Sequence, residues 1–127
     1  AGMHLVEIIA ALAVFQYLLF IVFVGRARMK YGIKAPATTG HEMFERNYRV
    51  QMNTLELLVM FLPLLLLAGR HWPHAAVATM GLVYLAGRFL YRYQYLNDPA
   101  TRAPGFALSM LPIIVLLLMA LLGAIRA

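Results

Sequence analysis

Four long apolar runs constrain this chain more than any other feature of its sequence. The first, residues 5–24, carries only Glu7 near its start and Gln16 in its middle, and about 20 apolar residues suffice for a helix to cross a bilayer. Because 63% of the 127 residues are hydrophobic and 13% are charged, a soluble domain of this size has too little interior to hide the apolar surface. The sequence therefore predicts an all-α membrane protein, a four-helix transmembrane bundle that forms a single domain over residues 1–127.

The other three spans are predicted at residues 45–69, 74–95 and 105–125. The continuous apolar run of the second span, residues 55–69, is too short to cross alone, so this span must include the charged segment before it. Pro63 and Pro112 predict kinks within the second and fourth spans, because proline removes a backbone donor and clashes with the preceding turn. Pro73 and Pro104 are placed to open the third and fourth helices.

Basic residues are distributed unevenly about these spans. Of the eleven Lys and Arg, only Arg70 and Arg126 fall outside the side shared by the first and third loops. The positive-inside rule therefore predicts an integral, multi-pass protein with loops one and three in the cytoplasm and both termini on the opposite side. We expect no separate signal peptide, because the first span lacks a cleavage site, and Ala1-Gly2 ahead of Met3 is interpreted as a cloning remnant. The nine basic residues on the shared side are Arg26, Arg28, Lys30, Lys34, Arg46, Arg49, Arg88, Arg92 and Arg102.

Composition also excludes several kinds of site. The chain has no cysteine, so it forms neither a disulfide framework nor a thiolate metal site. The four histidines lack the spacing of metal ligands on one helix face, and we expect no metal. The net charge of +6 is explained by membrane topology, so we expect no nucleic-acid partner.

Charged and polar side chains form a stripe along each of two predicted helices. On the second helix, spacings of three, four and three residues put one set on a single face: Arg46, Arg49, Asn53 and Glu56. On the third helix the set is Tyr84, Arg88, Tyr91 and Tyr95. A charged side chain in mid-bilayer costs about 2.5–3.5 kcal/mol, so we expect both stripes to face protein, water or a ligand.

Each stripe also has a structural interpretation. Arg49 and Glu56 are candidates for an intramembrane ion pair that fixes helix register, and Asn53 for a hydrogen bond between helices. Tyrosines near a helix end are typical of the membrane interface. Arginines outnumber carboxylates on the two stripes, however, so pairing within the protein leaves positive charge that an anionic ligand would satisfy.

Three segments carry a resemblance to a known family. Residues 44–56, FERNYRVQMNTLE, resemble the second-helix signature of the MAPEG family, the membrane-associated proteins of eicosanoid and glutathione metabolism. Thr38-Thr39-Gly40 and residues 81–95, GLVYLAGRFLYRYQY, look like the first loop and third helix of the same family. The match extends over residues 28–102 without a gap. It implies a homotrimer that holds glutathione between neighbouring subunits, near the cytoplasmic ends of the helices.

The resemblance also implies which residues form the site. By motif position, eight residues would bind glutathione: Arg28, Arg49, Gln51, Asn53, Glu56, Tyr91, Tyr95 and Arg102. Arg102, with Tyr91, would be catalytic, because Arg102 matches the arginine that holds the thiolate in the family's leukotriene-forming member. Leu57 and Met29 depart from that member, which has a tyrosine and a second arginine there. The leukotriene chemistry is therefore not implied, and the NTLE sequence is closer to the general microsomal transferases.

The activity implied is that of a membrane-bound glutathione transferase. Glutathione would be the co-substrate, and a hydrophobic electrophile or a lipid hydroperoxide would reach its sulfur from the membrane lipid; peroxidase and isomerase activities stay open. One alternative is a non-catalytic lipid-binding scaffold of the same family. The other is a small multidrug antiporter, which needs an isolated membrane carboxylate. Glu7 is the only candidate in the first span, and the arginines would repel cationic drugs.

Overall fold

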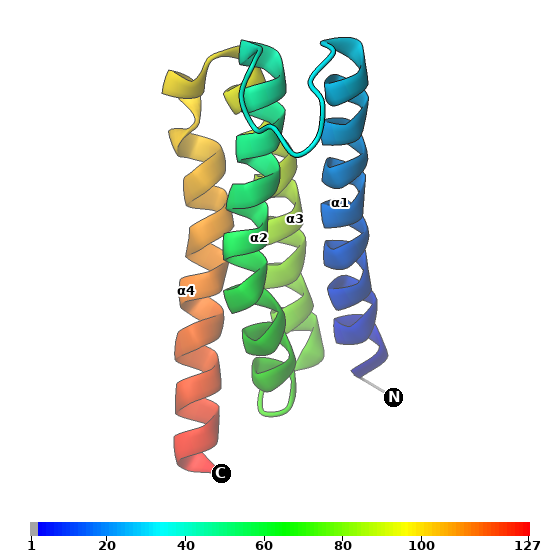
Figure 1. The fold of residues 1–127 in the computed structure, drawn as a ribbon. Coiled ribbons are helices and arrows are strands. Elements are labelled where there is room, and N and C mark those ends of the chain that lie inside the picture. Colours follow the sequence, from blue (N-terminus) through cyan, green and yellow to red (C-terminus); the bar gives the residue numbers. More distant parts are fainter. Residues whose placement is uncertain (1–2) are drawn as a thin grey trace.

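The predicted all-helical architecture is confirmed by a computed structural model, which describes residues 3–127. Ala1 and Gly2, interpreted above as a cloning remnant, lie outside the described residues. Within residues 3–127 there are four long helices, one short 3-10 helix and no strand. They are α1 (Met3–Lys30), α2 (Glu42–Gly69), α3 (His74–Asn97), η1 (Pro99–Thr101) and α4 (Ala103–Arg126). The long helices lie side by side, with the α1–α2 loop and η1 at one end and the α2–α3 turn near the other (Figure 1).

Three of the four long helices meet the length and hydropathy expected of a membrane span, namely α1, α2 and α4. Helix α3 has 24 residues and is long enough, but it is less apolar. Arg88, Arg92 and a row of tyrosines lower its hydropathy. The structure and sequence together indicate an integral membrane protein, whereas a crossing by α3 stays a prediction.

The helices are longer than the sequence predicted at the end that carries the α1–α2 loop. Helix α1 continues past Val24 to Lys30, so Arg26 and Arg28 lie on its last turns rather than in the expected loop. Helix α2 begins at Glu42, where the His41 Nδ1 atom accepts a hydrogen bond of 3.1 Å from the Met43 backbone amide. Helices α2 and α4 continue through Pro63 and Pro112.

The bundle has an apolar core, and it also exposes many large apolar side chains on its outer surface. The core is centred on Phe61, Leu65, Val77 and Leu116, each of which is fully buried. Helix α4 turns Leu111, Leu118 and Leu121 outward, each more than half exposed. In water such a surface would aggregate, so its exposure agrees with a lipid surround.

Helices α3 and α4 approach each other closely where glycines allow it. A Cβ atom at Gly87 would lie 2.7 Å from the Leu108 carbonyl carbon and 2.8 Å from the Ser109 backbone nitrogen. Gly105 meets the Tyr91 backbone in the same way one turn nearer the loops. This contact fixes the position of Tyr91 relative to the start of α4.

Replacing Gly87 with alanine should destabilise the fold by about 1–3 kcal/mol, because backbone atoms cannot move aside as a flexible side chain can. Gly25 is the matched control, since a Cβ atom there would have no neighbour within 4 Å. Gly25→Ala should be neutral or stabilising by up to about 1 kcal/mol, through helix propensity. Thermal unfolding of both variants in detergent, followed by circular dichroism, measures the difference. Equal or higher stability for Gly87→Ala would show that the two helices do not pack this closely.

Candidate functional site

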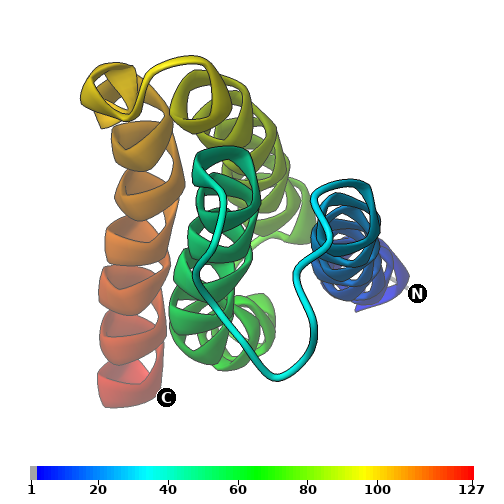
Figure 2. The same ribbon diagram turned by 45° about the horizontal axis from the view of Figure 1, so that its top comes forward.

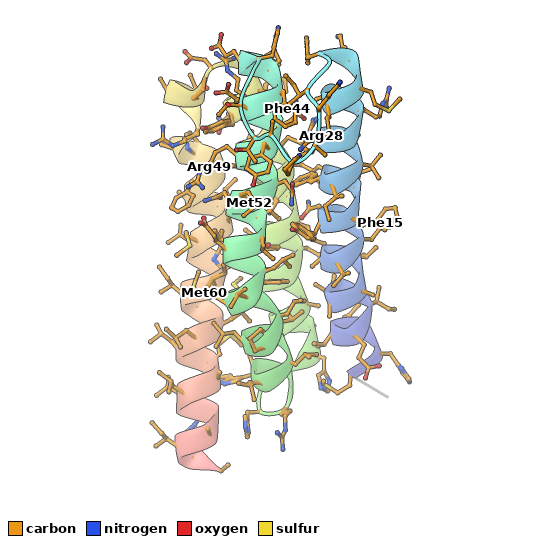
Figure 3. The ribbon with its side chains drawn as sticks, viewed as in Figure 1. Phe15, Arg28, Phe44, Arg49, Met52 and Met60 are labelled. Atoms are coloured by element: carbon orange, nitrogen blue, oxygen red, sulfur yellow. The ribbon has the colours of Figure 1, made fainter. Side chains whose placement is uncertain are left out.

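A pocket of about 720 Å³ opens at the loop end of the bundle, between α2, α3, η1 and the start of α4. Its wall brings together five of the eight residues that the sequence predicted as ligands. These five are Arg49, Asn53, Tyr91, Tyr95 and Arg102, and the rest of the wall is Ala100, Ala103 and Phe106. Figure 3 shows Arg49 on the side of α2 that faces α4. The wall thus combines two guanidinium groups, an amide and two tyrosines, a set suited to anionic groups.

A buried arginine adjoins this pocket. Arg88 on α3 is 0% exposed and links three helices through its hydrogen bonds. Its Nε donates to the Ser109 hydroxyl at 2.8 Å, and its Nη1 donates to the Asn53 Oδ1 atom at 2.7 Å and to the Thr54 hydroxyl at 3.2 Å. Its guanidinium also lies 4.3 Å from the centroid of the Tyr91 ring. No carboxylate pairs with Arg88 among residues 3–127.

These bonds set the orientation of the Asn53 amide. A guanidinium carries only donors, so the Asn53 oxygen must face Arg88. The two N–H donors of the same amide are then left for the pocket that Asn53 lines. The predicted hydrogen bond between helices is therefore present, and it leaves Asn53 able to donate to a carboxylate or carbonyl of a ligand.

Arg49 and Glu56 form the ion pair that their spacing suggested. The Arg49 Nη2 atom lies 3.8 Å from the Glu56 Oε1 atom, and the side chains are 50% and 55% exposed. Glu56 does not line the pocket itself. An ion pair that is half exposed and this long contributes little stability, so both groups remain available to other partners.

The pocket wall is completed from α3 and from the segment that precedes α4. Tyr91 is only 2% exposed, and its ring centroid lies 5.6 Å from that of Tyr95. Arg102 is exposed at the start of α4, where its Nη1 donates to the Pro99 carbonyl at 3.0 Å. This bond orients the Arg102 side chain on the pocket wall, and its other N–H donors have no partner among residues 3–127.

Arg28 and Gln51 lie outside this pocket in the single chain. The Arg28 Nη1 atom donates to the Ala37 carbonyl at 2.8 Å, and its guanidinium lies over the Phe44 ring. Figure 3 shows Arg28 beside Phe44, on the α1 side of α2. Gln51 donates to the Tyr17 hydroxyl at 3.0 Å. The eight predicted ligands therefore divide between two faces of α2.

Arg46, the outermost arginine of the stripe on α2, binds other groups of the protein itself. It donates to the Leu96 and Asn97 carbonyls at 2.8 and 3.3 Å, and so satisfies the last turn of α3. It also pairs with Glu42 one turn earlier. Among residues 3–127, no three His, Asp or Glu side chains gather closely enough to hold a metal ion.

Fold and pocket together define a helical membrane protein with a pocket, lined by two arginines and two tyrosines, at one end of its bundle. Residues 6–122 match the model of the MAPEG family, and the chain belongs to that family. An uncharacterized protein of Synechocystis sp. is 47% identical over 116 residues, covering 91% of this chain and 85% of that relative. Human microsomal glutathione S-transferase 2 is 37% identical over 95% of this chain and 80% of its own length. Leukotriene C4 synthase of Cavia porcellus is 35% identical, over 94% and 79%.

Proposed function

We propose that this protein is a membrane-bound glutathione transferase that conjugates the glutathione thiolate to hydrophobic electrophiles. The observation that carries the proposal is the pocket in which Arg49, Asn53 and Arg102 converge beside two tyrosines. Two relatives have names that specify glutathione transfer or leukotriene C4 synthesis, which supports a glutathione-related transferase at the level of the family.

The chemistry of glutathione matches the charges around the pocket. The tripeptide carries two carboxylates and one ammonium group. Arg49 and the Asn53 amide supply donors for a carboxylate, since guanidinium forks suit carboxylate oxygens. Glu56, whose carboxylate pairs with Arg49, supplies the negative charge for the ammonium group of glutathione. Arg102 is then the cation left for the sulfur.

Ionising the sulfur is the chemical task of the site. A free thiol has a pKa near 8.5, so less than about a tenth is thiolate at pH 7. Lowering that pKa by about two units takes roughly 2.7 kcal/mol of differential stabilisation. One charge-assisted hydrogen bond, worth about 1.5–3 kcal/mol, supplies most of it. We assign that bond to Arg102, with the Tyr91 hydroxyl as the second donor.

The tested activity is conjugation of glutathione to a generic aryl halide by the purified protein in detergent. The proposal expects saturable turnover above the uncatalysed rate. The same chain heated to unfolding is the control. Binding of glutathione without turnover would favour the non-catalytic scaffold, and absence of both would refute the proposal.

Arg49→Ala should weaken glutathione binding at least tenfold, or about 1.4 kcal/mol. The substitution removes one guanidinium fork and leaves Glu56 without its 3.8 Å partner. Arg70→Ala, at the other end of α2, removes the same charge outside the pocket and should leave binding unchanged. Calorimetry in detergent measures both dissociation constants. If a folded Arg49→Ala protein has the wild-type dissociation constant for glutathione, the Arg49–Glu56 ion pair serves only to hold the structure.

The protein should assemble as a homotrimer. In a single chain Arg49 and Glu56 are about half exposed on a membrane helix, where a charge facing lipid costs about 2.5–3.5 kcal/mol. Arg28 on α1 and Gln51 on the α1 side of α2 lie away from the pocket of their own chain, and we assign them to the pocket of a neighbouring subunit. Light scattering in detergent should give the mass of three chains. A monomer at all concentrations would contradict this assembly.

The membrane orientation is proposed from the charge distribution. The start of α1 and the end of α4 lie at the end of the bundle away from the α1–α2 loop and η1 (Figure 1). Most of the basic residues lie at the loop end, which the positive-inside rule places in the cytoplasm. The pocket would then open toward cytoplasmic glutathione, while its apolar electrophile arrives from the lipid.

A further inference from the structure

A second pocket lies at the loop end of the bundle, on the face where α1 meets α3 and the start of α2. Its volume is about 430 Å³, within the range of small-ligand sites. It shares no residue with the proposed glutathione pocket. Figure 2 brings this end forward and shows α1 and α4 on opposite sides of α2. The lining residues are Phe23, Arg26, Ala27, Lys30, Tyr31, Met43, Asn47 and Arg92.

The lining of this second pocket is cationic and contains no carboxylate. Arg26, Lys30 and Arg92 contribute three positive charges. The ion pairs found among residues 3–127 involve Glu7, Glu42 and Glu56, and none of them includes these three cations. The positive charge of this pocket therefore has no acidic partner in the part of the chain that the structure describes.

The guanidinium of Arg92 is held in place within this pocket. Its Nη2 atom donates to the Asn47 Oδ1 atom at 3.0 Å, and Asn47 is itself fixed by a 2.9 Å bond from its Nδ2 atom to the Met43 carbonyl. The centroid of the Phe23 ring lies 4.1 Å from the Arg92 guanidinium carbon. The Lys30 ammonium lies 5.4 Å from the centroid of the Tyr31 ring. A fixed guanidinium is prepared to bind a phosphate, because little side-chain entropy remains to be lost.

The pocket is distinct from the region around Arg28. Arg26 and Lys30 each lie two residues from Arg28, which is about 200° around a helix. Arg28 turns toward the α1–α2 loop, where it binds the Ala37 carbonyl, while Arg26 and Lys30 line the second pocket. The basic side chains of α1 thus lie on two different faces of the helix, Arg28 on one and Arg26 and Lys30 on the other.

Apolar surface continues from this pocket toward the middle of the bundle. Val22 lies one turn before Arg26 on α1 and is 48% exposed, and Phe89 lies one turn before Arg92 on α3 and is 50% exposed. The pocket therefore stands at the boundary between an apolar outer surface and a basic helix end. In a bilayer that boundary is the depth of the lipid headgroups.

We propose that this pocket binds the phosphate headgroup of an anionic membrane lipid, whose acyl chains lie along Val22 and Phe89. The phosphate contacts Arg92, with Arg26 and Lys30 at the rim. A soluble phosphate ester shares the headgroup chemistry, but it would gain nothing from the apolar surface below. The site lies apart from the proposed glutathione pocket, so it does not depend on the proposed function.

Native mass spectrometry of the full chain in neutral detergent tests this lipid site. The probes are phosphatidylglycerol, phosphatidylcholine and inorganic phosphate. The wild-type protein should retain phosphatidylglycerol in preference to phosphatidylcholine. The double variant Arg26→Gln/Lys30→Gln should bind phosphatidylglycerol at least tenfold more weakly, because each basic residue near a membrane surface contributes to anionic-lipid affinity. Both residues are exposed, so this variant should still fold.

The control is Lys34→Gln/Arg70→Gln, which removes the same charge from residues outside the second pocket. It should retain phosphatidylglycerol at wild-type affinity. Three results would overturn the lipid site: equal binding of phosphatidylcholine, equal binding of inorganic phosphate at the same concentration, or an equal loss in the control. Thermal unfolding of both double variants confirms that any loss of lipid reflects the pocket rather than the fold.

Discussion

Replacing Arg102 with alanine should slow conjugation roughly ten- to hundredfold at pH 7 while leaving glutathione affinity within a few-fold of wild type. The carboxylates of glutathione are assigned to Arg49 and Asn53, so most of the binding energy remains. Removing the cation beside the sulfur disfavours the thiolate, and the pKa of the bound thiol should rise by about one to two units. Because thiolate forms again as the pH rises above this new pKa, part of the lost rate should return in alkaline buffer.

The readout for Arg102 is the ultraviolet absorbance of thiolate, titrated with glutathione bound to wild type and variant. Arg102→Lys keeps the charge without the fork, and it should fall between the two. Arg126→Ala removes a cation from the far end of α4, where it lies over the Trp72 ring, and it should titrate like wild type. Superimposable curves for wild type and Arg102→Ala would move the thiolate contact to Tyr91 or Arg28.

Arg88→Met should leave the fold intact but weaken glutathione binding by roughly ten- to hundredfold, or about 1.4–2.7 kcal/mol. The variant loses three hydrogen bonds from a charged donor, each worth about 1.5–3 kcal/mol. It also relieves the burial of a guanidinium that has no carboxylate partner among residues 3–127, a penalty of several kcal/mol. These two terms largely cancel in stability. The Asn53 amide, however, loses the bond that turns its donors into the pocket.

A double-mutant cycle separates this positioning role from a general effect on packing. Asn53→Ala, Arg88→Met and the double variant are compared by calorimetry, and the two losses should overlap by at least about 1 kcal/mol. Thr54→Val is the matched control, since it removes the longer 3.2 Å bond and spares the bond to Asn53. Additive losses would show that Arg88 does not act through Asn53.

The sequence predicted the helices better than it predicted the faces that the helices bury. Hydrophobic runs and flanking prolines located all four helices, because these signals are local. The stripe on α2 also followed from spacing. Spacing did not separate Asn53, which is 7% exposed, from Glu56, whose side chain is 55% exposed. That difference depends on where α3 and α4 lie, which the period of α2 alone does not specify.

Two members of the buried network escaped the sequence analysis. Thr54 and Ser109 contact Arg88, yet Thr54 lies beside the predicted ligand Asn53 at the edge of an apolar run and Ser109 is a single hydroxyl residue within one. For Ser109 a signal exists, because it follows Gly105 by four residues on the face that packs closely against α3. Arg28 and Gln51 were predicted as glutathione ligands, and a single chain does not bring them to the pocket, so their role stays a prediction.

The most direct test of the proposed function is whether the protein ionises glutathione. Glutathione is added to the purified wild-type protein at pH 7, and thiolate absorbance is followed as a difference spectrum. We predict a saturable rise that disappears once excess aryl halide has consumed the glutathione, with one conjugate formed and one halide ion released for each glutathione lost. A flat difference spectrum at saturating glutathione, from a protein that is folded by circular dichroism, would contradict the assignment of this pocket to glutathione transfer.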